Sequence, residues 1–411
     1  MAGMLSARPL LFALCFLATL TAGVGIAPRA QDLKIPPLPA PVEGAIRVAQ
    51  FNAALNRPGA GVLLADIRKG HPQVSAVAAI IRAVRPDILL LNEFDRDAEG
   101  RALDSFAALL AEAGAAPVDY PHRFHAPVNT GVPSHRDLDR DGRATGPGDA
   151  WGWGAFPGQY GMAVLSRHPI RTDAVRSWQR FLWSALPGAL RPVMPDGTPF
   201  HDDETWNLLR LSSKSHWAIP IDTPAGLVTL VAAHPTPPVF DGPENRNGRR
   251  NHDEIRLLHA IATEPGADWL VDDAGLAGGL AEGTPFVIAG DLNADPADGA
   301  AERDALMALL SDDRLQDPEP SSEGAFAAAR AQGAGNGRQK GPAAQDTADW
   351  RDTPGPGNLR VDYVLPASRF EVMASGVFWP APGEPGAPLM RAGKRPASSD
   401  HRLVWVDIRL P

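Results

Sequence analysis

The sequence predicts an α/β fold, in which strands and helices alternate along most of the chain. Three segments support this prediction. Residues 46–51 alternate apolar and polar side chains, which is typical of a strand with one buried face. Apolar residues recur at helical spacing from Val74 to Val84, and Pro86 ends that helix. Residues 87–91 then form an apolar run, as expected of a strand that is covered on both sides.

Later segments repeat the strand pattern and are separated by long loops. The strand-like segments are 286–289, 361–365 and 403–408. The stretches rich in Gly, Pro and Asp, which predict loops, are 121–160, 187–204 and 316–358. With 40 Gly and 41 Pro in 411 residues, long loops are favoured over long helices. Within the last loop, the Ala-, Gly- and Gln-rich run 324–345 is expected to be disordered.

Composition indicates an ordinary globular protein without a basic domain. Hydrophobic residues make up 44% of the chain and charged residues 21%, which supports a sizeable core. The formal net charge of −9 argues against the broad cationic surface of a tight nucleic-acid binder. It does not exclude an enzyme that turns nucleic acid over, because a bound metal ion can supply positive charge at one point.

The first residues have the pattern of a secretory signal peptide, predicted over 1–23. Arg8 precedes the apolar run 10–20, and small residues follow it. The run is too short for a comfortable membrane span. We therefore expect export to the periplasm or the extracellular space. The single cysteine, Cys15, lies inside this run, so the mature protein would have no disulfide and no thiolate metal site.

The remainder of the chain is interpreted as one linker and one domain. Residues 24–44 are rich in proline and predict an extended linker. Residues 45–411 carry the alternating strands and helices and are interpreted as a single domain. No membrane span is expected in the mature chain, and no feature indicates an obligate protein partner.

Short acidic, amide and imidazole side chains stand at or near the ends of the predicted strands. They are Asn52, Glu93, Asp291, Asn293, Asp362, Asp400 and His401. Any one of them alone is more commonly a turn former that bonds its own backbone. A rigid sheet can nevertheless bring such groups together from distant parts of the sequence. Hard oxygen ligands of this kind suit Mg²⁺ or Mn²⁺ better than zinc.

Six short motifs occur in a characteristic order along the chain. They are Phe51-Asn52, Leu91-Asn92-Glu93, Ala233-His234-Pro235, Gly290-Asp291-Leu292-Asn293, Arg360-Val361-Asp362-Tyr363 and Ser399-Asp400-His401. In this order they resemble the endonuclease/exonuclease/phosphatase superfamily over nearly all of the mature chain. The resemblance implies a deoxyribonuclease-like fold. This is a four-layer α/β/β/α sandwich of two packed mixed β-sheets, with the site at one edge of the sheets.

The resemblance, together with side-chain chemistry, implies a role for each acidic residue and amide. Glu93, helped by Asn52, would hold the metal ion that polarises a phosphoryl oxygen. Asp400 is interpreted as a second metal ligand. Asp291 would orient or deprotonate the attacking water, and Asn293 would donate a hydrogen bond to the phosphate oxygens in the transition state.

The two histidines of the motifs are expected to contact the phosphate. His234 would donate to its oxygens. Several relatives carry Tyr at this place, and the His found here instead matches the deoxyribonuclease branch. His401 would contact the phosphate, with Asp362 fixing its tautomer and favouring its charged form. The sequence leaves both His401 and Asp291 open as the base.

Basic residues elsewhere have two interpretations each. Arg246, Arg249 and Arg250 open a predicted helix and would either grip phosphate or form a solvated basic turn. Lys214 and His216 alternate in a predicted strand and belong either to the site or, as we favour, to an exposed part of the sheet.

An acidic loop and an aromatic segment follow one another. Asp137, Asp139 and Asp141 have the spacing of a calcium loop, with Gly142 in its sixth place. Its twelfth place holds Gly148 instead of Glu. The loop either binds structural Ca²⁺ or is a plain acidic turn.

The aromatic segment that follows contains Trp151, Trp153, Phe156 and Tyr160. These side chains either stack on bases or sugars or, as we favour, cover the sheet.

The sequence thus predicts a divalent-metal-dependent hydrolase of phosphoester bonds. A phosphodiesterase, such as a nuclease, is the favoured form. The alternatives are a phosphomonoesterase, a phospholipid head-group hydrolase, or an inactive binding module on the same fold. The intact set of motif residues argues against the binding module.

Overall fold

The computed structural model describes residues 35–112, 117–224, 226–392 and 395–410. The predicted signal peptide and the first part of the predicted linker lie outside these residues. The described part of the linker, 35–44, forms neither helix nor strand. It runs along the domain, because the Leu38 N–H donates to the Ala83 carbonyl at 2.8 Å and Leu38 packs against the core. Within the described residues, no helix is long and apolar enough to cross a membrane.

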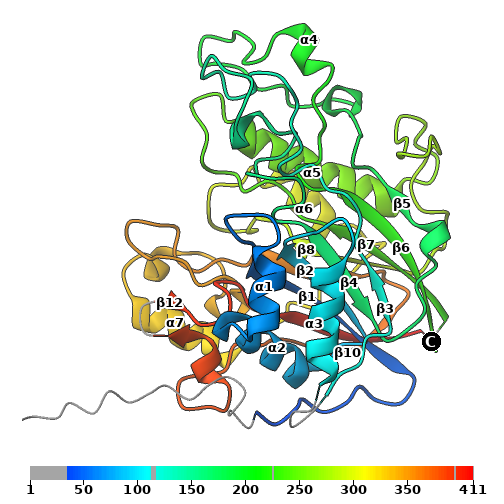
Figure 1. Cartoon of the computed structure of the whole chain (residues 1–411), viewed down its shortest axis with the longest axis vertical. Coiled ribbons are helices and arrows are strands. Elements are labelled where there is room, and N and C mark those ends of the chain that lie inside the picture. Colours follow the sequence, from blue (N-terminus) through cyan, green and yellow to red (C-terminus); the bar gives the residue numbers. More distant parts are fainter. Residues whose placement is uncertain (1–34, 113–116, 225, 393–394, 411) are drawn as a thin grey trace, which may run out of the picture.

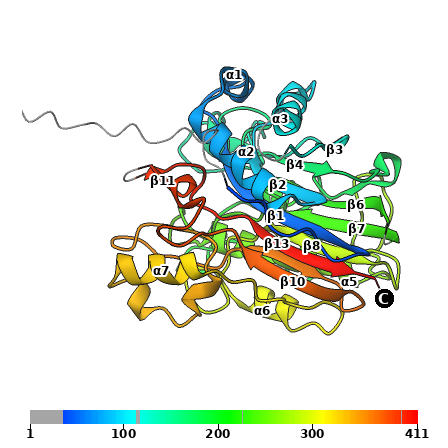
Figure 2. The same cartoon turned by 90° about the horizontal axis from the view of Figure 1, so that it is seen from below.

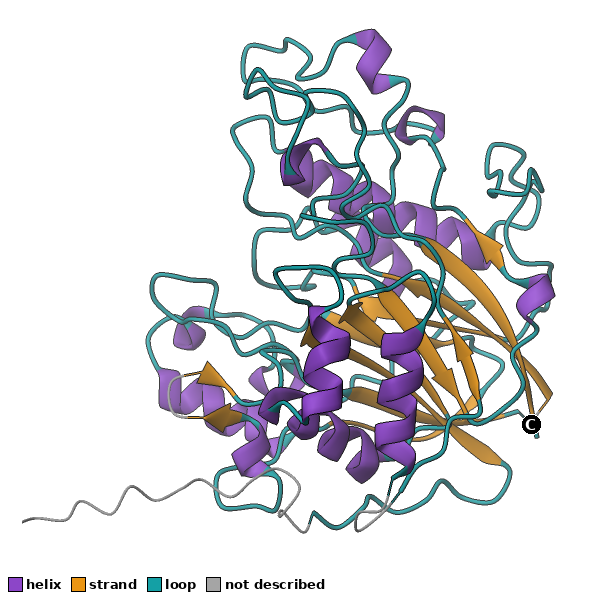
Figure 3. Ribbon diagram, viewed as in Figure 1, coloured by secondary structure: helices purple, strands orange, loops and turns teal. Residues whose placement is uncertain are grey.

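Two mixed β-sheets form the centre of the protein (Figures 1 and 3). The first has the order β10-β13-β1-β2-β4-β3 and contains β1 (Ala45–Leu55), β2 (Ile88–Phe94), β3 (His122–Phe124), β4 (Met162–Ser166), β10 (Glu371–Val377) and β13 (Val404–Arg409). The second has the order β5-β6-β7-β8-β9 and contains β5 (Arg176–Ser177), β6 (His216–Thr223), β7 (Gly226–Ala233), β8 (Phe286–Asp291) and β9 (Asp362–Pro366). The pairs β1–β2 and β7–β8 are parallel, and the other neighbours are antiparallel. A small hairpin of β11 (Arg391–Ala392) and β12 (Arg395–Pro396) stands apart.

Helices cover the outer faces of both sheets. The α-helices of the described residues are α1 (Val62–Lys69), α2 (Pro72–Val84), α3 (Arg101–Ala111), α4 (Asp203–Trp206), α5 (Arg246–Thr263), α6 (Asp304–Leu310) and α7 (Glu323–Gln332), and α4 lies among the loops beyond the sheets. Single 3-10 turns occur at Pro147–Asp149, Thr172–Ala174, Trp183–Ala185, Asn336–Arg338, Ala343–Gln345 and Ala387–Leu389. Figure 2 shows α1, α2 and α3 outside the first sheet, and α5 and α6 outside the second. The predicted four-layer sandwich is therefore confirmed.

The central position of β1 explains a difference from the sequence prediction. Its alternation predicts one buried face, but nearly the whole strand is buried. One face packs against the second sheet and the other lies under the helices, so its polar side chains are buried too. Gln50 donates to the Asn92 side chain at 2.7 Å, and the Arg47 guanidinium is paired with Asp407. The polar residues of this strand therefore bind other buried side chains. In most strands with alternating side chains, the polar residues face solvent instead.

The segment expected to be disordered contains a helix. Helix α7 begins after Ser322, whose hydroxyl accepts the Ala325 N–H at 3.1 Å as an N-cap. A Cβ on Gly324 would lie 2.0 Å from the Trp379 carbonyl oxygen, so glycine allows the helix to approach that backbone closely. The low-complexity run therefore packs against the domain, and the prediction of disorder for 324–345 was wrong for α7.

Two of the predicted loops lie together beyond the sheets. The loop 187–204 contains only the start of α4, and 121–160 contains only β3 and one 3-10 turn. Both lie near the first turns of α5 (Figure 1). Arg249 donates to the Arg191 carbonyl and Arg250 to the Trp151 carbonyl, so the helix holds the two loops side by side.

The buried ion pair between β1 and β13 provides a test of the sheet. Arg47 and Asp407 are register partners, and their side chains, 3% and 5% exposed, are joined at 2.7 Å and 2.8 Å. Asp407→Ala would leave a buried cation without its carboxylate. We expect the free energy of unfolding to fall by about 3–5 kcal/mol in denaturant titrations. The exposed pair Arg409–Glu371 on the same sheet is the control, and Glu371→Ala should cost about 0–1 kcal/mol. Equal losses would contradict this account.

Candidate active site

The ends of several strands bring the predicted polar residues to one edge of the two sheets. Asn52 lies toward the end of β1 and Glu93 toward the end of β2, while Asp291 ends β8. His234 directly follows β7, which is parallel to β8. Asp362 opens β9 as the register partner of Asp291. Because β1 packs against β8 and β9 across the core, both sheets contribute to the same site.

Asp291 lies at the centre of the site and is 1% exposed. Its Oδ2 accepts the Asn52 Nδ2–H at 2.9 Å and lies 3.4 Å from His234 Nε2 and 3.7 Å from His401 Nε2. Its Oδ1 accepts the Asn293 N–H at 2.9 Å. This one carboxylate therefore contacts an amide and two imidazoles that come from three other parts of the chain.

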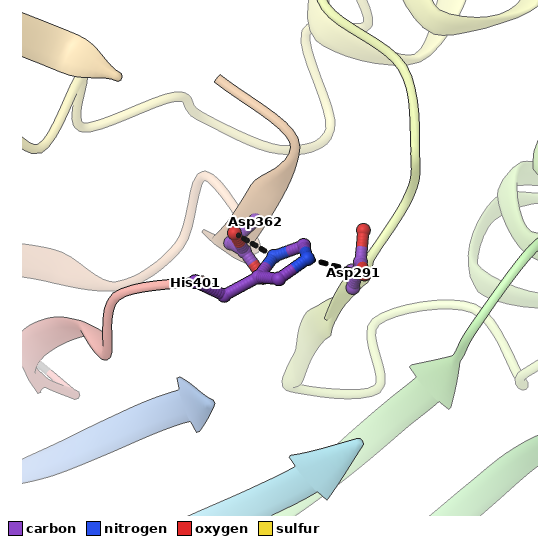
Figure 4. Close-up of side chains that lie close together, drawn as sticks. All are labelled: Asp291, Asp362 and His401. Atoms are coloured by element: carbon purple, nitrogen blue, oxygen red, sulfur yellow. Dashed lines mark hydrogen bonds and ion pairs between the residues drawn. The ribbon is translucent and has the colours of Figure 1, made fainter. Parts of the chain in front are cut away.

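His401 lies between two carboxylates (Figure 4). Its Nδ1 is 2.9 Å from Asp362 Oδ2, while its Nε2 faces Asp291. The Thr347 hydroxyl donates to the same Asp362 oxygen at 2.7 Å and accepts the N–H groups of Val361 and Asp362. The Asp362 carboxylate is thereby held in place, and it fixes the direction of the imidazole.

Burial and charge set the protonation of this group. Burial alone would raise the pKa of Asp291, but His401, His234 and Asn52 lower it below its usual range. Burial alone would lower the pKa of His401, but the Asp362 and Asp291 carboxylates raise it well above its usual value. Burial, assisted by the Asp291 charge and opposed by His401, raises the pKa of Asp362 to about 6. Burial and the nearby Lys214 lower the pKa of His234. At neutral pH, Asp291 is therefore ionised, His401 is cationic and His234 is neutral.

Glu93 lies beside this group with two amides. Its carboxylate accepts the Asn52 Nδ2–H at 3.2 Å and the Asn56 Nδ2–H at 2.6 Å. Glu93 has φ 57° and Asn293 φ 52°, a left-handed conformation that costs about 1–3 kcal/mol when it is imposed on such residues. Strained backbone of this kind concentrates at functional sites.

The donor set around Glu93 suits a hard divalent cation. Glu93 and Asp291 supply carboxylate oxygens, and the Asn52 Nδ2–H donates to both of them. Asn56 also donates its Nδ2–H to Glu93, so each amide would supply its oxygen to a cation only after turning over. Such oxygen ligands fit Mg²⁺ or Mn²⁺. One ligand atom from each of Asp291, Asp362 and His401 also lies within 4.8 Å of the others. Both His401 nitrogens already face carboxylates, so we interpret that second group as a proton-holding network.

Asp400 is placed differently from the other predicted metal ligands. Its Oδ2 accepts the Trp350 Nε1–H at 3.0 Å, and Trp350 stacks edge-to-face on His401. Within the described residues, the Asp400 carboxylate joins neither the group around Glu93 nor the group of Asp291, Asp362 and His401. In this structure Asp400 therefore holds the Trp350 indole against His401.

A cavity of about 660 Å³ opens next to Glu93 and His234. Its aromatic lining residues are Trp151, Trp153, Tyr160, Trp183 and Phe240. Its arginine and lysine lining residues are Arg210, Lys214, Arg246 and Arg250. Three of the four aromatic residues expected to stack or to cover the sheet thus line this cavity, and the side chain of Trp153 is 59% exposed. Phe156 is outside the lining.

Most of these arginines are engaged by the protein. Arg250 donates to three backbone carbonyls, Arg246 is paired with Glu244, and Arg210 donates to Asn129. Arg249, outside the lining, donates to a backbone carbonyl. Of the three predicted phosphate contacts, Arg249 and Arg250 therefore hold loops against α5, and Arg246 and Arg250 line the cavity.

Lys214 and His216 are both buried, so the favoured expectation that they are exposed was wrong. His216 lies between the Ser212 hydroxyl at 2.6 Å and the Glu254 carbonyl at 2.9 Å, which is a structural position. Lys214 is 6% exposed and lines the cavity. Within the described part of the chain, its ammonium has neither a hydrogen bond nor an ion pair. Burial lowers its pKa, while the carboxylates of Glu254 and Glu93 oppose the shift.

Two contacts of the site escaped the sequence analysis. Asn56 carried a weak signal, as a second amide just beyond Asn52. Thr347 carried none, because it stands in an irregular loop and reaches Asp362 only through the tertiary fold.

Residues 49–401 match the model of the Endonuclease/Exonuclease/phosphatase family, so the chain belongs to this family. Its members are hydrolases that act on phosphoester bonds and depend on divalent metal ions. A search of curated proteins gives no match.

Several solved structures are similar to this chain. One is an endonuclease/exonuclease/phosphatase protein from Beutenbergia cavernae, with 21% identity, covering 89% of this chain and 72% of that chain, at a TM-score of 0.47. Another is sphingomyelinase C from Streptomyces griseocarneus, with 14% identity and a TM-score of 0.44. The match covers 88% of this chain and 99% of that chain. The human Nocturnin catalytic domain has 15% identity and a TM-score of 0.40. The match covers 90% of this chain and 94% of that chain. These similarities select no substrate.

The contact between Asp362 and His401 predicts that the two act as a unit. His401→Ala should lower kcat by about 10²–10⁴-fold, the range for a positioned proton donor or acceptor. Asp362→Asn should lower kcat strongly alone but little in the His401→Ala background. Steady-state kinetics of the double-mutant cycle measures this coupling, and additive losses would contradict it. His259→Ala removes a comparable pair with Asp312 outside the site and should leave kcat unchanged.

Proposed function

We propose that this protein is a divalent-metal-dependent phosphodiesterase that acts on small or single-stranded nucleotide diesters. The observation that carries the proposal is that the ionised Asp291 and cationic His401 lie beside His234, which together with Glu93 lines an open, aromatic-walled cavity. The predicted signal peptide, 1–23, supports an activity outside the cytoplasm.

Glu93 would hold the metal ion, with amide oxygens of Asn52 and Asn56 completing the protein ligands. When bound, the ion polarises a phosphoryl oxygen and neutralises charge in the transition state. Both amides now donate N–H groups to the Glu93 carboxylate, so each would turn by half a rotation to present its oxygen to the ion.

The protein's own groups divide the remaining chemistry. Asp291, ionised and facing the site, accepts a proton from water as the water oxygen bonds to phosphorus. The bond to the leaving oxygen then breaks, and solvent protonates that oxygen. His401, kept cationic by Asp362, stabilises the negative phosphoryl oxygens through its charge. Neutral His234, whose Nε2 faces Asp291 at 3.4 Å, would turn this N–H toward the phosphoryl oxygens to donate to them. The protonation states favour Asp291 as the base over His401.

Charge in the cavity favours a diester. A phosphodiester carries one negative charge at neutral pH, whereas a monoester carries nearly two. Lys214 is the lining cation that no protein group engages in the described structure, and it lies near Glu93 and His234. With the metal ion and His401 at the phosphoryl oxygens, Lys214 is the one further unengaged cation among the described lining residues, so no additional positive charge is provided for the second negative charge of a monoester.

The shape of the cavity favours a small or unpaired nucleotide. Its volume of about 660 Å³ is in the range of small-molecule sites and cannot enclose a duplex. Trp153 and Phe240, 59% and 88% exposed, offer flat faces on which a base can stack. The chain's net charge of −9 agrees with an enzyme that does not track a long duplex.

A substrate panel tests this function. With Mg²⁺ or Mn²⁺, we expect hydrolysis of dinucleotides and single-stranded DNA or RNA, with slower cleavage of duplex DNA. Chelator or Glu93→Gln should abolish most of this activity without changing the melting temperature, whereas Glu99→Gln on an exposed helix start should have no effect. Full activity in excess chelator would exclude the metal mechanism. Cleavage of only a monoester or a phospholipid would identify a phosphomonoesterase or a head-group hydrolase.

Lys214 provides a test of the cavity. Lys214→Met keeps the length of the side chain and removes its charge. We expect kcat/KM for a dinucleotide to fall by about 10–100-fold, mainly through KM, because a charge-assisted hydrogen bond to phosphate is lost. Lys69→Met, at the exposed end of α1, is the control. An unchanged KM would show that the substrate phosphate lies elsewhere.

A further inference from the structure

The loop that forms one wall of the cavity is closed at its neck by backbone contacts. Bridges join Thr130 to Gly152 and Pro133 to Ala150. The Trp151 N–H also donates to the Val132 carbonyl at 2.9 Å. Two limbs of the loop, residues 134–141 and residues 146–149, extend from these paired segments. A cluster of carboxylates lies between the two limbs.

The carboxylates of Asp137, Asp139 and Asp149 face one another. One oxygen of each lies within 4.8 Å of the others. The first two residues belong to one limb and Asp149 to the other. Asp141, which the sequence spacing included, is outside this group, and its Oδ1 accepts the Arg143 N–H. The structure thus substitutes Asp149 for Asp141 in the predicted calcium set.

Buried oxygens without partners point to a ligand at this cluster. Asp149 is 2% exposed, and its Oδ1 accepts the Leu138 N–H at 2.7 Å. Its Oδ2 is buried with no hydrogen-bond partner, as is Asp137 Oδ1. A buried carboxylate oxygen that has lost water without gaining a donor is strongly destabilising. A cation between the three carboxylates removes this cost.

The surrounding arginines do not neutralise the cluster. Arg136 is paired with Glu204 at 2.8 Å, and Arg140 donates to the Phe200 carbonyl. In the described residues, none of the three carboxylates has an ion-pair partner. Three negative charges therefore converge with no protein cation, which is the arrangement that a divalent ion compensates.

The glycine in the motif's twelfth place has a steric reason. A Cβ on Gly148 would lie 2.0 Å from Asp139 Oδ2. Glycine therefore lets this carboxylate reach the cluster, and the neighbouring Asp149 supplies the acidic group that the motif normally has there.

We propose that Asp137, Asp139 and Asp149 bind a structural Ca²⁺ ion that staples the two limbs of this loop. Ca²⁺ is favoured over Mg²⁺ because it accepts irregular sets of oxygen ligands from loops. Asp139 and Gly148 line the cavity, and Trp151 and Trp153 follow the site directly. The ion would therefore fix the wall that carries these two indoles. This inference does not depend on the proposed catalytic function.

Limited proteolysis of the full chain tests the proposal. Arg140 and Arg143 are exposed trypsin sites within the loop. With Mg²⁺ present throughout for the catalytic residues, millimolar Ca²⁺ should slow cleavage after these arginines by about tenfold, because it binds only the closed loop. It should also raise the melting temperature by roughly 2–5 °C. Mass spectrometry identifies the cleaved bonds.

Matched variants distinguish the site from the sequence motif. Asp149→Asn should abolish both responses to Ca²⁺, and Asp139→Asn, at an exposed position, should do the same if the first variant does not fold. Asp141→Asn should retain both responses. A wild-type protein with no response to Ca²⁺ would overturn the proposal. Equal losses in Asp141→Asn and Asp149→Asn would overturn the assignment of Asp149.

Discussion

The candidate active site depends on keeping one carboxylate, Asp291, ionised although it is 1% exposed. A buried charge is costly unless donors and opposite charges surround it. Asn52 and the Asn293 N–H supply donors, and His401 supplies the positive charge. These groups come from both sheets and from a loop before β13. The sandwich therefore brings distant segments of the chain together around the Asp291 carboxylate, and these segments stabilise its charge.

The same requirement explains how the two sheets are joined. Asn92, on β2 of the first sheet, accepts the Asp291 N–H at 3.2 Å and donates to the Ala233 carbonyl at 3.4 Å. Gln50 holds the Asn92 side chain from β1. Buried amides thus fix the distance between the sheets at the level of the site. Catalytic geometry and core packing are consequently set by the same residues.

Much of the fold and the centre of the site could be predicted because both depend on local pattern. The apolar run at Leu89–Leu91 and the polar residues after each strand indicated the sheets and their active edge. Thr347 and Lys214 could not be assigned in this way. Thr347 reaches Asp362, and Lys214 reaches the cavity, from irregular segments where neither spacing nor periodicity carries information.

In the acidic loop, the spacing of residues in the sequence did not identify all of the carboxylates that lie together. The motif placed Asp141 with Asp137 and Asp139, but the backbone turns so that Asp149 takes its position. Helix α7 shows the converse. Its composition indicated disorder, whereas an N-cap and one close contact at Gly324 make it a packed helix. Both outcomes depend on contacts that composition and spacing do not contain.

Asp291 and Asp362 together hold His401 as a cation. Nitrogen-15 chemical shifts of histidine-labelled protein measure this directly at pH 7.5, with His401→Gln identifying the signal. We predict that both ring nitrogens of His401 have the shifts of a protonated imidazolium, and that Asp291→Asn restores titration closer to the ordinary pKa of histidine. A neutral His401 ring at this pH in the wild-type protein would contradict the account.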